Sequence, residues 1–145
     1  MKLKSLFAIH FGKKLENSLV HWALLITRVL VALLMLRHGF GKLMGFENIA
    51  PHFPDPLGVG STVSLVLVIG SEFFASLFLL FGFLTRWSVL TTFITMLIAA
   101  FMTHGPDPFE KKELALLYAV VYLLFLISGA GKYSLDFYFK KKFRI

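Results

Sequence analysis

Two charged residues lie inside long apolar stretches of this sequence. Arg28 is in the first stretch and Glu72 in the second. A charge at the centre of a helix in a lipid bilayer costs about 2.5–3.5 kcal/mol on insertion scales. Each of the two therefore needs an ion-pair partner, a cavity or a chemical role. A buried carboxylate can transfer a proton, and a buried cation can stabilise negative charge that develops on a bound molecule.

Helical spacing groups these charges with further polar residues. At about 100° per residue, the first stretch gathers a set of side chains within an arc of about 100°. This set is Arg28, Met35, His38, Gly39 and Lys42. The second stretch has a face of small and polar residues suited to close helix contact. This face carries Ser61, Ser64, Glu72, Ala75, Ser76 and Gly82, whereas Val63, Phe74, Phe78 and Phe81 lie opposite and are expected to face lipid.

Depth along the helices brings several of these side chains to one end. With a rise of about 1.5 Å per residue, Arg28 lies about 10 Å and Glu72 about 18 Å from the inner helix ends. His38 and His104 lie about 25 Å and 27 Å along on the same scale. We expect a polar pocket that opens to the outside and is lined by His38, Lys42, His104 and Glu113.

Simpler roles for the same residues remain open. Arg28 and Glu72 could form a buried pair that only fixes helix register, or Glu72 could turn toward His38. The two histidines stand near helix ends, where interfacial placement is common, and the Lys42 side chain could reach the interface. Glu113 fits the acidic first turn that a helix dipole favours.

Ionisable groups from four helices converge, which favours the functional interpretation. Within it, the candidate catalytic residues are Glu72, His38 and His104. The candidate ligand-binding residues are Arg28, Lys42 and Glu113. No metal site is expected.

The elements that must hold these residues are transmembrane helices. Hydrophobic residues make up 57% of the 145 residues and charged residues 16%, which is outside the usual range of soluble domains. A membrane crossing needs about 20 helical residues, and the continuous apolar runs exclude alternating barrel strands. We therefore expect an all-α polytopic membrane protein, a four-transmembrane-helix bundle with helices at about 21–43, 62–84, 86–103 and 113–129.

The distribution of Lys and Arg predicts the orientation. Four of the 15 lie within residues 1–20, five within 132–145, and Arg86 lies between the second and third stretches. With an even number of spans, this bias places both termini in the cytoplasm. Residues 1–20 are expected to form a basic amphipathic segment and residues 132–145 a basic aromatic tail. We interpret both segments as membrane anchors, so a nucleic-acid partner is not expected. The chain has no cysteine, which excludes thiol chemistry.

A series of short motifs runs in order along the apolar body. It consists of Arg28, His38-Gly39, Lys42, Glu72, Gly82, Thr85-Arg86, His104, Glu113, Ala115, Tyr118 and the ending Gly-Ala-Gly-Lys-Tyr-Ser-Leu-Asp at 129–136. In order and spacing, this series resembles the DoxX family of small four-helix membrane proteins, over roughly Leu24 to Asp136. The ending is the most specific single motif.

The resemblance implies a multi-pass protein of the cytoplasmic (inner) membrane, with residues 21–131 as the DoxX-like domain. Family members are commonly described as oxidoreductases, and a related branch supplies the membrane subunit of a thiosulfate:quinone oxidoreductase. We therefore expect the membrane subunit of a quinone-linked oxidoreductase system with a quinone at the polar pocket. The sequence has no dinucleotide fingerprint, so electrons must come from a protein partner or a soluble donor. Haem is disfavoured, because two histidines at similar depth are not a clean axial pair.

Two other function classes remain open. The chain could be a non-enzymatic membrane partner or assembly subunit whose basic tails bind a cytosolic protein or anionic lipid. A small proton-coupled transporter with Glu72 as its coupling residue is less favoured, because four helices are few unless the protein forms a homo-oligomer.

Overall fold

The computed structural model describes residues 13–143, with side chains from Ser18 onward. Of these residues 82% are helical, and none of them lies in a strand. The all-α prediction is confirmed for this part of the chain. Most of the predicted N-terminal segment lies outside the described residues, and residues 13–20 continue the first long helix without a break.

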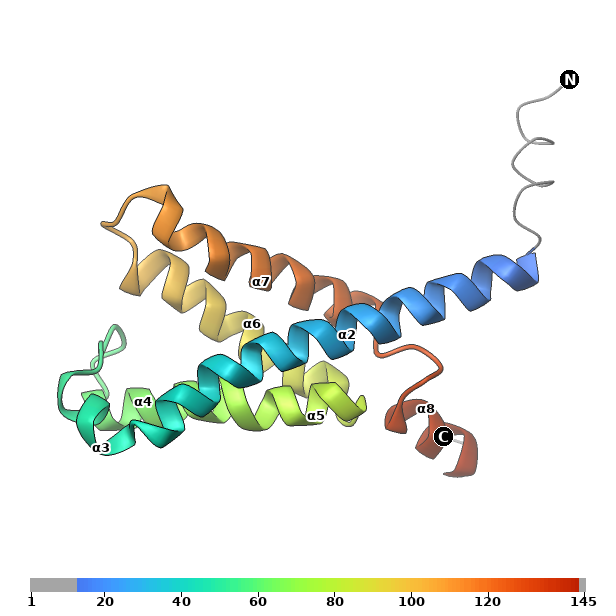
Figure 1. Ribbon diagram of the computed structural model, residues 1–145, viewed down its shortest axis with the longest axis horizontal. Coiled ribbons are helices and arrows are strands. Elements are labelled where there is room, and N and C mark those ends of the chain that lie inside the picture. Colours follow the sequence, from blue (N-terminus) through green and yellow to red (C-terminus); the bar gives the residue numbers. More distant parts are fainter. Residues whose placement is uncertain (1–12, 144–145) are drawn as a thin grey trace, which may run out of the picture.

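Four long helical segments form the body of the molecule (Figure 1). The first is α2 (Lys13–Met44), and the second is a continuous rod made of α4 (Ser61–Ile69), a π-helical turn (Gly70–Ala75) and α5 (Ser76–Phe81). The third is α6 (Thr85–Ile98) with a second π-helical turn (Ala99–Thr103), and the fourth is α7 (Phe109–Ser128). The short helices are α3 (Phe46–Ile49), a 3₁₀ turn (Ala50–His52) and α8 (Leu135–Phe143).

Within the described residues, three segments are long and apolar enough to cross a membrane: Ser18–Met44, Ser61–Phe81 and Thr85–Thr103. The helix α7 has 20 residues, but its first turns carry Glu110, Lys111, Lys112 and Glu113. Its uninterrupted apolar part is therefore shorter than the usual span of about 20 residues.

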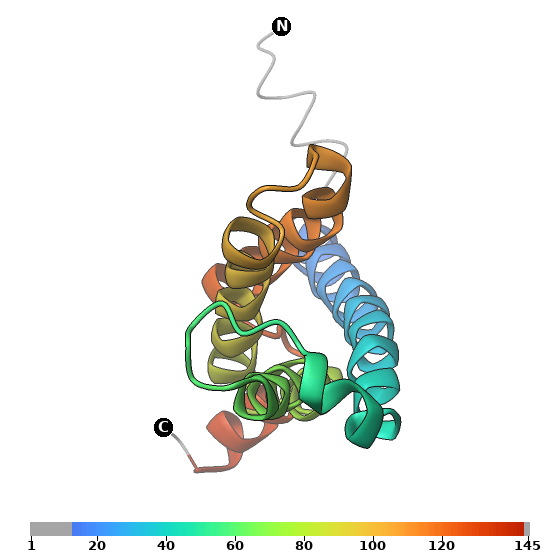
Figure 2. The ribbon, with the colours of Figure 1, turned by 90° about the vertical axis from the view of Figure 1, so that its left-hand side faces the viewer.

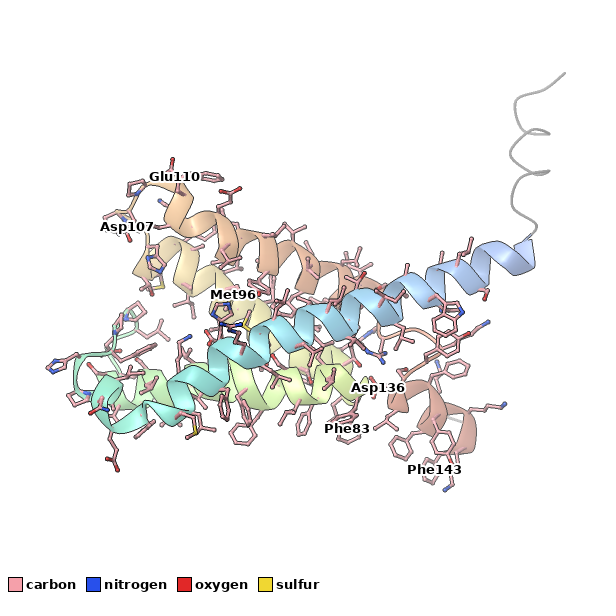
Figure 3. The ribbon with its side chains drawn as sticks, in the orientation of Figure 1. Phe83, Met96, Asp107, Glu110, Asp136 and Phe143 are labelled. Atoms are coloured by element: carbon pink, nitrogen blue, oxygen red, sulfur yellow. The ribbon has the colours of Figure 1, made fainter. Side chains whose placement is uncertain are left out.

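The two ends of the bundle are formed by different loops and helices (Figures 1 and 2). The loops that join α2 to α4 and α6 to α7 lie at one end, which we call the loop end. The start of α2 and the helix α8 lie at the other, which we call the α8 end. Figure 3 places Asp107 at the loop end and Asp136 at the α8 end.

The interior packs side chains from all four segments. Val31 and Met35 of α2 meet Leu79 of α5, Met96 of α6 and Tyr122 of α7 in one apolar cluster. Met96 lies between the helices in Figure 3. The exterior is also apolar, and Ile127 for example is 74% exposed. A helical surface of this kind is suited to lipid rather than to water.

The two faces predicted for the second apolar stretch are confirmed. Ser64, Glu72, Ala75, Ser76 and Gly82 are buried, Ser61 at the start of the segment is half-buried, and Val63, Phe74, Phe78 and Phe81 are exposed. Gly39 explains how α2 approaches this buried face so closely. A Cβ atom at Gly39 would lie 2.6 Å from the backbone nitrogen of Phe73, so only glycine fits at this crossing.

Candidate functional site

A cavity of about 800 Å³ lies between α4 and α6 on the loop side of the first π-helical turn. The helix α6 contacts the rod at this turn, and α4 and α6 diverge from there toward the loop end (Figure 1). The walls are mostly apolar, with Val66, Leu67, Ile94 and Ile98 among the lining residues. The volume falls within the range of about 300–1,000 Å³ that is usual for small-molecule sites.

An ion pair between α2 and the rod supplies the charge in this cavity. Lys42 Nζ lies 2.5 Å from Glu72 Oε2, and the two side chains are 26% and 7% exposed. Both residues line the cavity. Pairing with Lys42 compensates for the cost of burying the Glu72 carboxylate. The sequence left open whether Glu72 meets Arg28 or His38, and in the structure its ion-pair partner is Lys42.

The Glu72 backbone belongs to the π-helical turn Gly70–Ala75. Such a turn inserts one extra residue and disrupts the regular helical hydrogen bonds. The carbonyl of Ser71 accepts a hydrogen bond from the Thr92 hydroxyl of α6 at 3.2 Å, which ties the two walls together. The second π-helical turn contributes Ala99 and Thr103 to the opposite wall. π-Helical turns occur frequently at functional sites, and neither of these two turns was predicted from the sequence.

His104 lines the cavity directly after the second π-helical turn. Its Nδ1 atom lies 2.9 Å from Oδ2 of Asp107. This hydrogen bond, and to a smaller extent the charge of Lys111, hold the pKa of the Asp107 carboxyl below its ordinary value. Sequence reasoning missed Asp107, although the spacing His104-x-x-Asp107 was a usable signal for a carboxylate that orients an imidazole.

A loop held by Asp55 covers the cavity at the loop end. Phe53, Pro54, Pro56 and Leu57 line the cavity from this loop. The Asp55 carboxylate accepts hydrogen bonds from the Val59 and Gly60 amides at 3.0 and 2.7 Å, and from the Ser64 hydroxyl at 2.7 Å. The Ser64 hydroxyl first, and then the backbone amides, lower the pKa of Asp55. The carboxylate thereby fixes the loop to the start of α4.

Arg28 lies at the α8 end and does not line the cavity. Its Nη1 atom donates a hydrogen bond to the Ala130 carbonyl at 2.8 Å, and Nη2 donates to the Tyr133 carbonyl at 2.7 Å. A Cβ atom at Gly82 would come within 2.8 Å of Nη1. Arg28 is thus enclosed by the motif at 129–136 and the turn after α5.

The same motif also fixes the start of α6. The Asp136 carboxylate accepts hydrogen bonds from the Leu84 and Thr85 amides at 2.8 and 2.9 Å. These amides are free at a helix N-terminus, where an acidic group is favoured. The motif that is most specific in sequence therefore holds helices together at the α8 end, away from the cavity.

Of the six predicted site residues, the structure brings Lys42, Glu72 and His104 to the cavity. His38 is exposed, and its ring meets the edge of Tyr118 at 6.1 Å between ring centroids. Glu113 is exposed on α7. Neither lines the cavity. Among the described residues there is no group of three or more His, Asp or Glu placed to hold a metal ion.

Comparison with known proteins finds one matching family model and several similar proteins. The DoxX family model matches residues 23–105. The inner membrane protein YqjF of Escherichia coli (strain K12) is 34% identical over 134 residues, which cover 90% of this chain and 98% of that protein. An uncharacterized protein of Haemophilus influenzae is 32% identical over 127 residues, covering 82% and 84%. The inner membrane protein YphA of Escherichia coli is 29% identical over 124 residues, covering 78% and 87%. No solved structure matches the chain significantly.

Proposed function

This chain belongs to the DoxX family of integral membrane proteins, and from that premise we propose that it is the membrane subunit of a quinone-linked oxidoreductase system. In this proposal residues 21–131 form the DoxX domain in the inner membrane, and α7 is its fourth span. Both termini are cytoplasmic, so the loop end faces outward. The electrons come from a protein partner or a soluble reductant.

The observation that carries the proposal is the apolar cavity with one buried ion pair. A quinone ring is flat and largely apolar, with two carbonyl oxygens that accept hydrogen bonds. It fits a site with hydrophobic walls and a few convergent polar groups. Lys42 offers such a donor beside Glu72, and His104 offers a second polar group on the wall formed by the end of α6.

Reduction of a quinone to a quinol takes up two electrons and two protons. In the proposed mechanism Lys42 donates a hydrogen bond to one carbonyl oxygen and stabilises the negative charge that develops there. The Glu72 carboxylate takes up a proton from the loop end and passes it to the same oxygen. His104, oriented by Asp107, delivers the second proton to the other oxygen.

The remaining predicted site residues have other roles in this proposal. Glu72 and His104 are the catalytic residues, and Lys42 binds the ring. Arg28 positions the helices at the α8 end through the Ala130 and Tyr133 carbonyls. His38 and Glu113 are assigned no contact with the ring, because they do not line the cavity.

The test measures the binding of ubiquinone-1, a short-chain quinone, to the purified protein in mild detergent by equilibrium dialysis. Replacing both partners, in the double variant Lys42→Gln/Glu72→Gln, avoids leaving one charge buried alone. We expect binding to weaken by about 10- to 100-fold, because losing a hydrogen bond to a charged group costs about 1.5–3 kcal/mol. The control is Glu110→Gln, a change at an exposed acid outside the cavity.

Mass spectrometry of the untreated preparation gives an independent measurement. Co-purified quinone that is lost in the double variant but retained in Glu110→Gln supports the proposal. A preparation that contains no quinone, does not bind ubiquinone-1 and arrives in complex with another protein contradicts it. That outcome favours the non-enzymatic partner or assembly subunit.

A further inference from the structure

A second, smaller groove lies next to the cavity, on the side of the α8 end. It has a volume of about 240 Å³ and is lined by Phe74, Ala75, Phe78, Leu84, Trp87 and Ser88. Gly70 and Thr91 line both the cavity and the groove, so the two hollows adjoin at these residues. We call the two adjoining hollows between the rod and α6 the channel. From Trp87 to His104 the channel follows α6 for about 25 Å, at a rise of about 1.5 Å per residue.

The channel opens sideways along the apolar exterior. Val66 and Ile94 line the cavity and are 51% and 47% exposed, and Phe78 and Trp87 line the groove and are 44% and 69% exposed. These residues belong to segments that are apolar enough to cross a membrane. The side opening therefore faces the hydrocarbon region of the bilayer.

Gly70 stands at the junction of cavity and groove. An added Cβ atom at Gly70 would meet no heavy atom within 4 Å. Close helix packing therefore does not require a glycine here, in contrast to Gly39, whose added Cβ would press on the rod. A glycine inside a helix costs about 0.5–1 kcal/mol relative to alanine. Its missing side chain keeps the junction open.

The position of the ion pair constrains the molecule that can occupy the channel. Glu72 is close to the middle of the span Ser61–Phe81, where the headgroup of a phospholipid would have to leave the interface at a high cost. A neutral ring with a long hydrocarbon chain has no such cost. The groove has a volume of only about 240 Å³ and is lined largely by apolar residues, which suits a single linear chain.

We propose that the channel binds a lipid-soluble quinone with a long polyprenyl chain. The ring lies beside the Lys42–Glu72 pair, and the chain passes Gly70 and runs along the groove toward Trp87. The substrate enters laterally from the bilayer between α4 and α6. This inference rests on the proposed function and adds the polyprenyl chain of the substrate, its place in the groove and its route of entry.

The test compares two probes on the full chain in lipid nanodiscs. The first is ubiquinone-1, whose binding reports on the ring site alone. The second is a ubiquinone with a photoreactive diazirine in a ten-carbon chain, followed by mass spectrometry of the labelled peptides. We expect label on α5 and α6 that excess unlabelled long-chain ubiquinone displaces. We expect little label on α7, although Leu117 and Ile127 are 60% and 74% exposed to lipid.

A matched pair of glycine variants tests the junction. Gly70→Leu fills the junction, and Gly41→Leu adds the same side chain at another helical glycine where an added Cβ also meets nothing within 4 Å. We expect Gly70→Leu to reduce groove labelling about tenfold, which corresponds to about 1.4 kcal/mol of chain binding, and Gly41→Leu to leave it unchanged. Size-exclusion elution and thermal melting verify that both variants are folded.

The outcomes separate the two proposals. If ubiquinone-1 binds but the label is spread evenly over α5, α6 and α7, the chain is dissolved in lipid and only the groove inference is overturned. Groove labelling that Gly70→Leu does not reduce overturns it as well. If ubiquinone-1 does not bind at all, the proposed function and the groove inference fail together. Because the label map is measured on the unmodified chain, the test holds even if Gly70→Leu does not fold.

Discussion

At the scale of single residues, the described side chains of α2 include two inward-facing cations, Arg28 and Lys42, that act in different ways. Arg28 is 2% exposed and holds two backbone carbonyls at the α8 end. Lys42 is partly accessible and pairs with a carboxylate in the cavity. The planar guanidinium can donate to two acceptors at fixed angles, whereas an ammonium group acts as a mobile point charge. Each residue type therefore matches its position.

Replacing Arg28 should destabilise the fold, and the size of the loss should depend on the new residue. In Arg28→Met the Ala130 and Tyr133 carbonyls lose their charged donor, and we expect the free energy of unfolding to fall by about 2–4 kcal/mol. In Arg28→Lys one hydrogen bond can form again, so we expect an intermediate loss. Unfolding in detergent, followed by circular dichroism, measures both. If Arg28→Lys is as stable as the unmodified chain, the forked geometry is not what stabilises this end.

The sequence was sufficient to place Arg28 and Glu72 inside the bundle but not to find their partners. An isolated charge in an apolar helix is visible in the residue types alone. The partners of Arg28 are main-chain carbonyls 102 and 105 residues away, and every residue type carries such a group. Nothing in the residue types of the 129–136 motif marks those carbonyls as acceptors.

At the scale of elements, the crossing of α2 over the rod depends on one of two nearby glycines. Gly39 touches the rod, whereas an added Cβ at Gly41 meets nothing within 4 Å. Gly39→Ala should force the helices apart and cost about 1–3 kcal/mol, as overpacking does. Gly41→Ala should stabilise α2 by about 0.5–1 kcal/mol through helix propensity. Thermal melting in detergent compares the two, and a loss of the same size in both would contradict the assigned crossing.

The π-helical turns limit what periodicity predicts about the site. A uniform advance of 100° per residue placed Glu72 and Ser76 on the buried face, and both are buried. It did not predict the turn Gly70–Ala75, which inserts an extra residue and changes the direction of the side chains around it. The sequence therefore predicted a polar pocket and three of the ionisable residues that line the cavity, but it predicted neither the cavity's place between α4 and α6 nor the Lys42–Glu72 pair.

The loop over the cavity should depend on pH through Asp55. Its lowered pKa means that the carboxylate stabilises the loop fully above the ordinary value of about 3.9. This contribution is lost as the pH falls through the lowered pKa of the folded state. We expect Asp55→Asn to be cleaved faster than the unmodified chain by a protease at pH 7, within the loop that includes Phe53 and Leu57.

The difference in cleavage should shrink below about pH 3.9, where the unmodified carboxyl begins to be protonated. A protease that is active in acid measures the cleavage of both chains at this low pH. Glu47→Gln is the control, because Glu47 is exposed on the neighbouring helix α3. A cleavage difference that stays constant down to pH 2 would show that the charge of Asp55 does not hold the loop.

At the scale of the whole molecule, the number of membrane crossings decides which side of the membrane the loop end of the cavity faces. The start of α2 and the helix α8 lie at one end of the bundle, and the loops that close the cavity lie at the other (Figure 1). If α7 crosses the membrane as well as the three apolar segments, both ends of the chain are on one side. The basic side chains Lys140, Lys141 and Lys142 of α8 favour the cytoplasmic side. The loop end, with His104 and Asp55, then faces outward.

The absence of cysteine from the chain allows a direct test of this topology. We expect single variants His52→Cys and Pro106→Cys, on the two loops, to react with a membrane-impermeant maleimide added outside intact spheroplasts. Lys141→Cys should react only after the membrane is disrupted. All three positions are exposed, so differences in reactivity report on sidedness. If Lys141→Cys reacts from outside together with Pro106→Cys, α7 does not cross the membrane. If Lys141→Cys alone reacts from outside, the bundle has the opposite orientation, and protons would reach Glu72 from the cytoplasm.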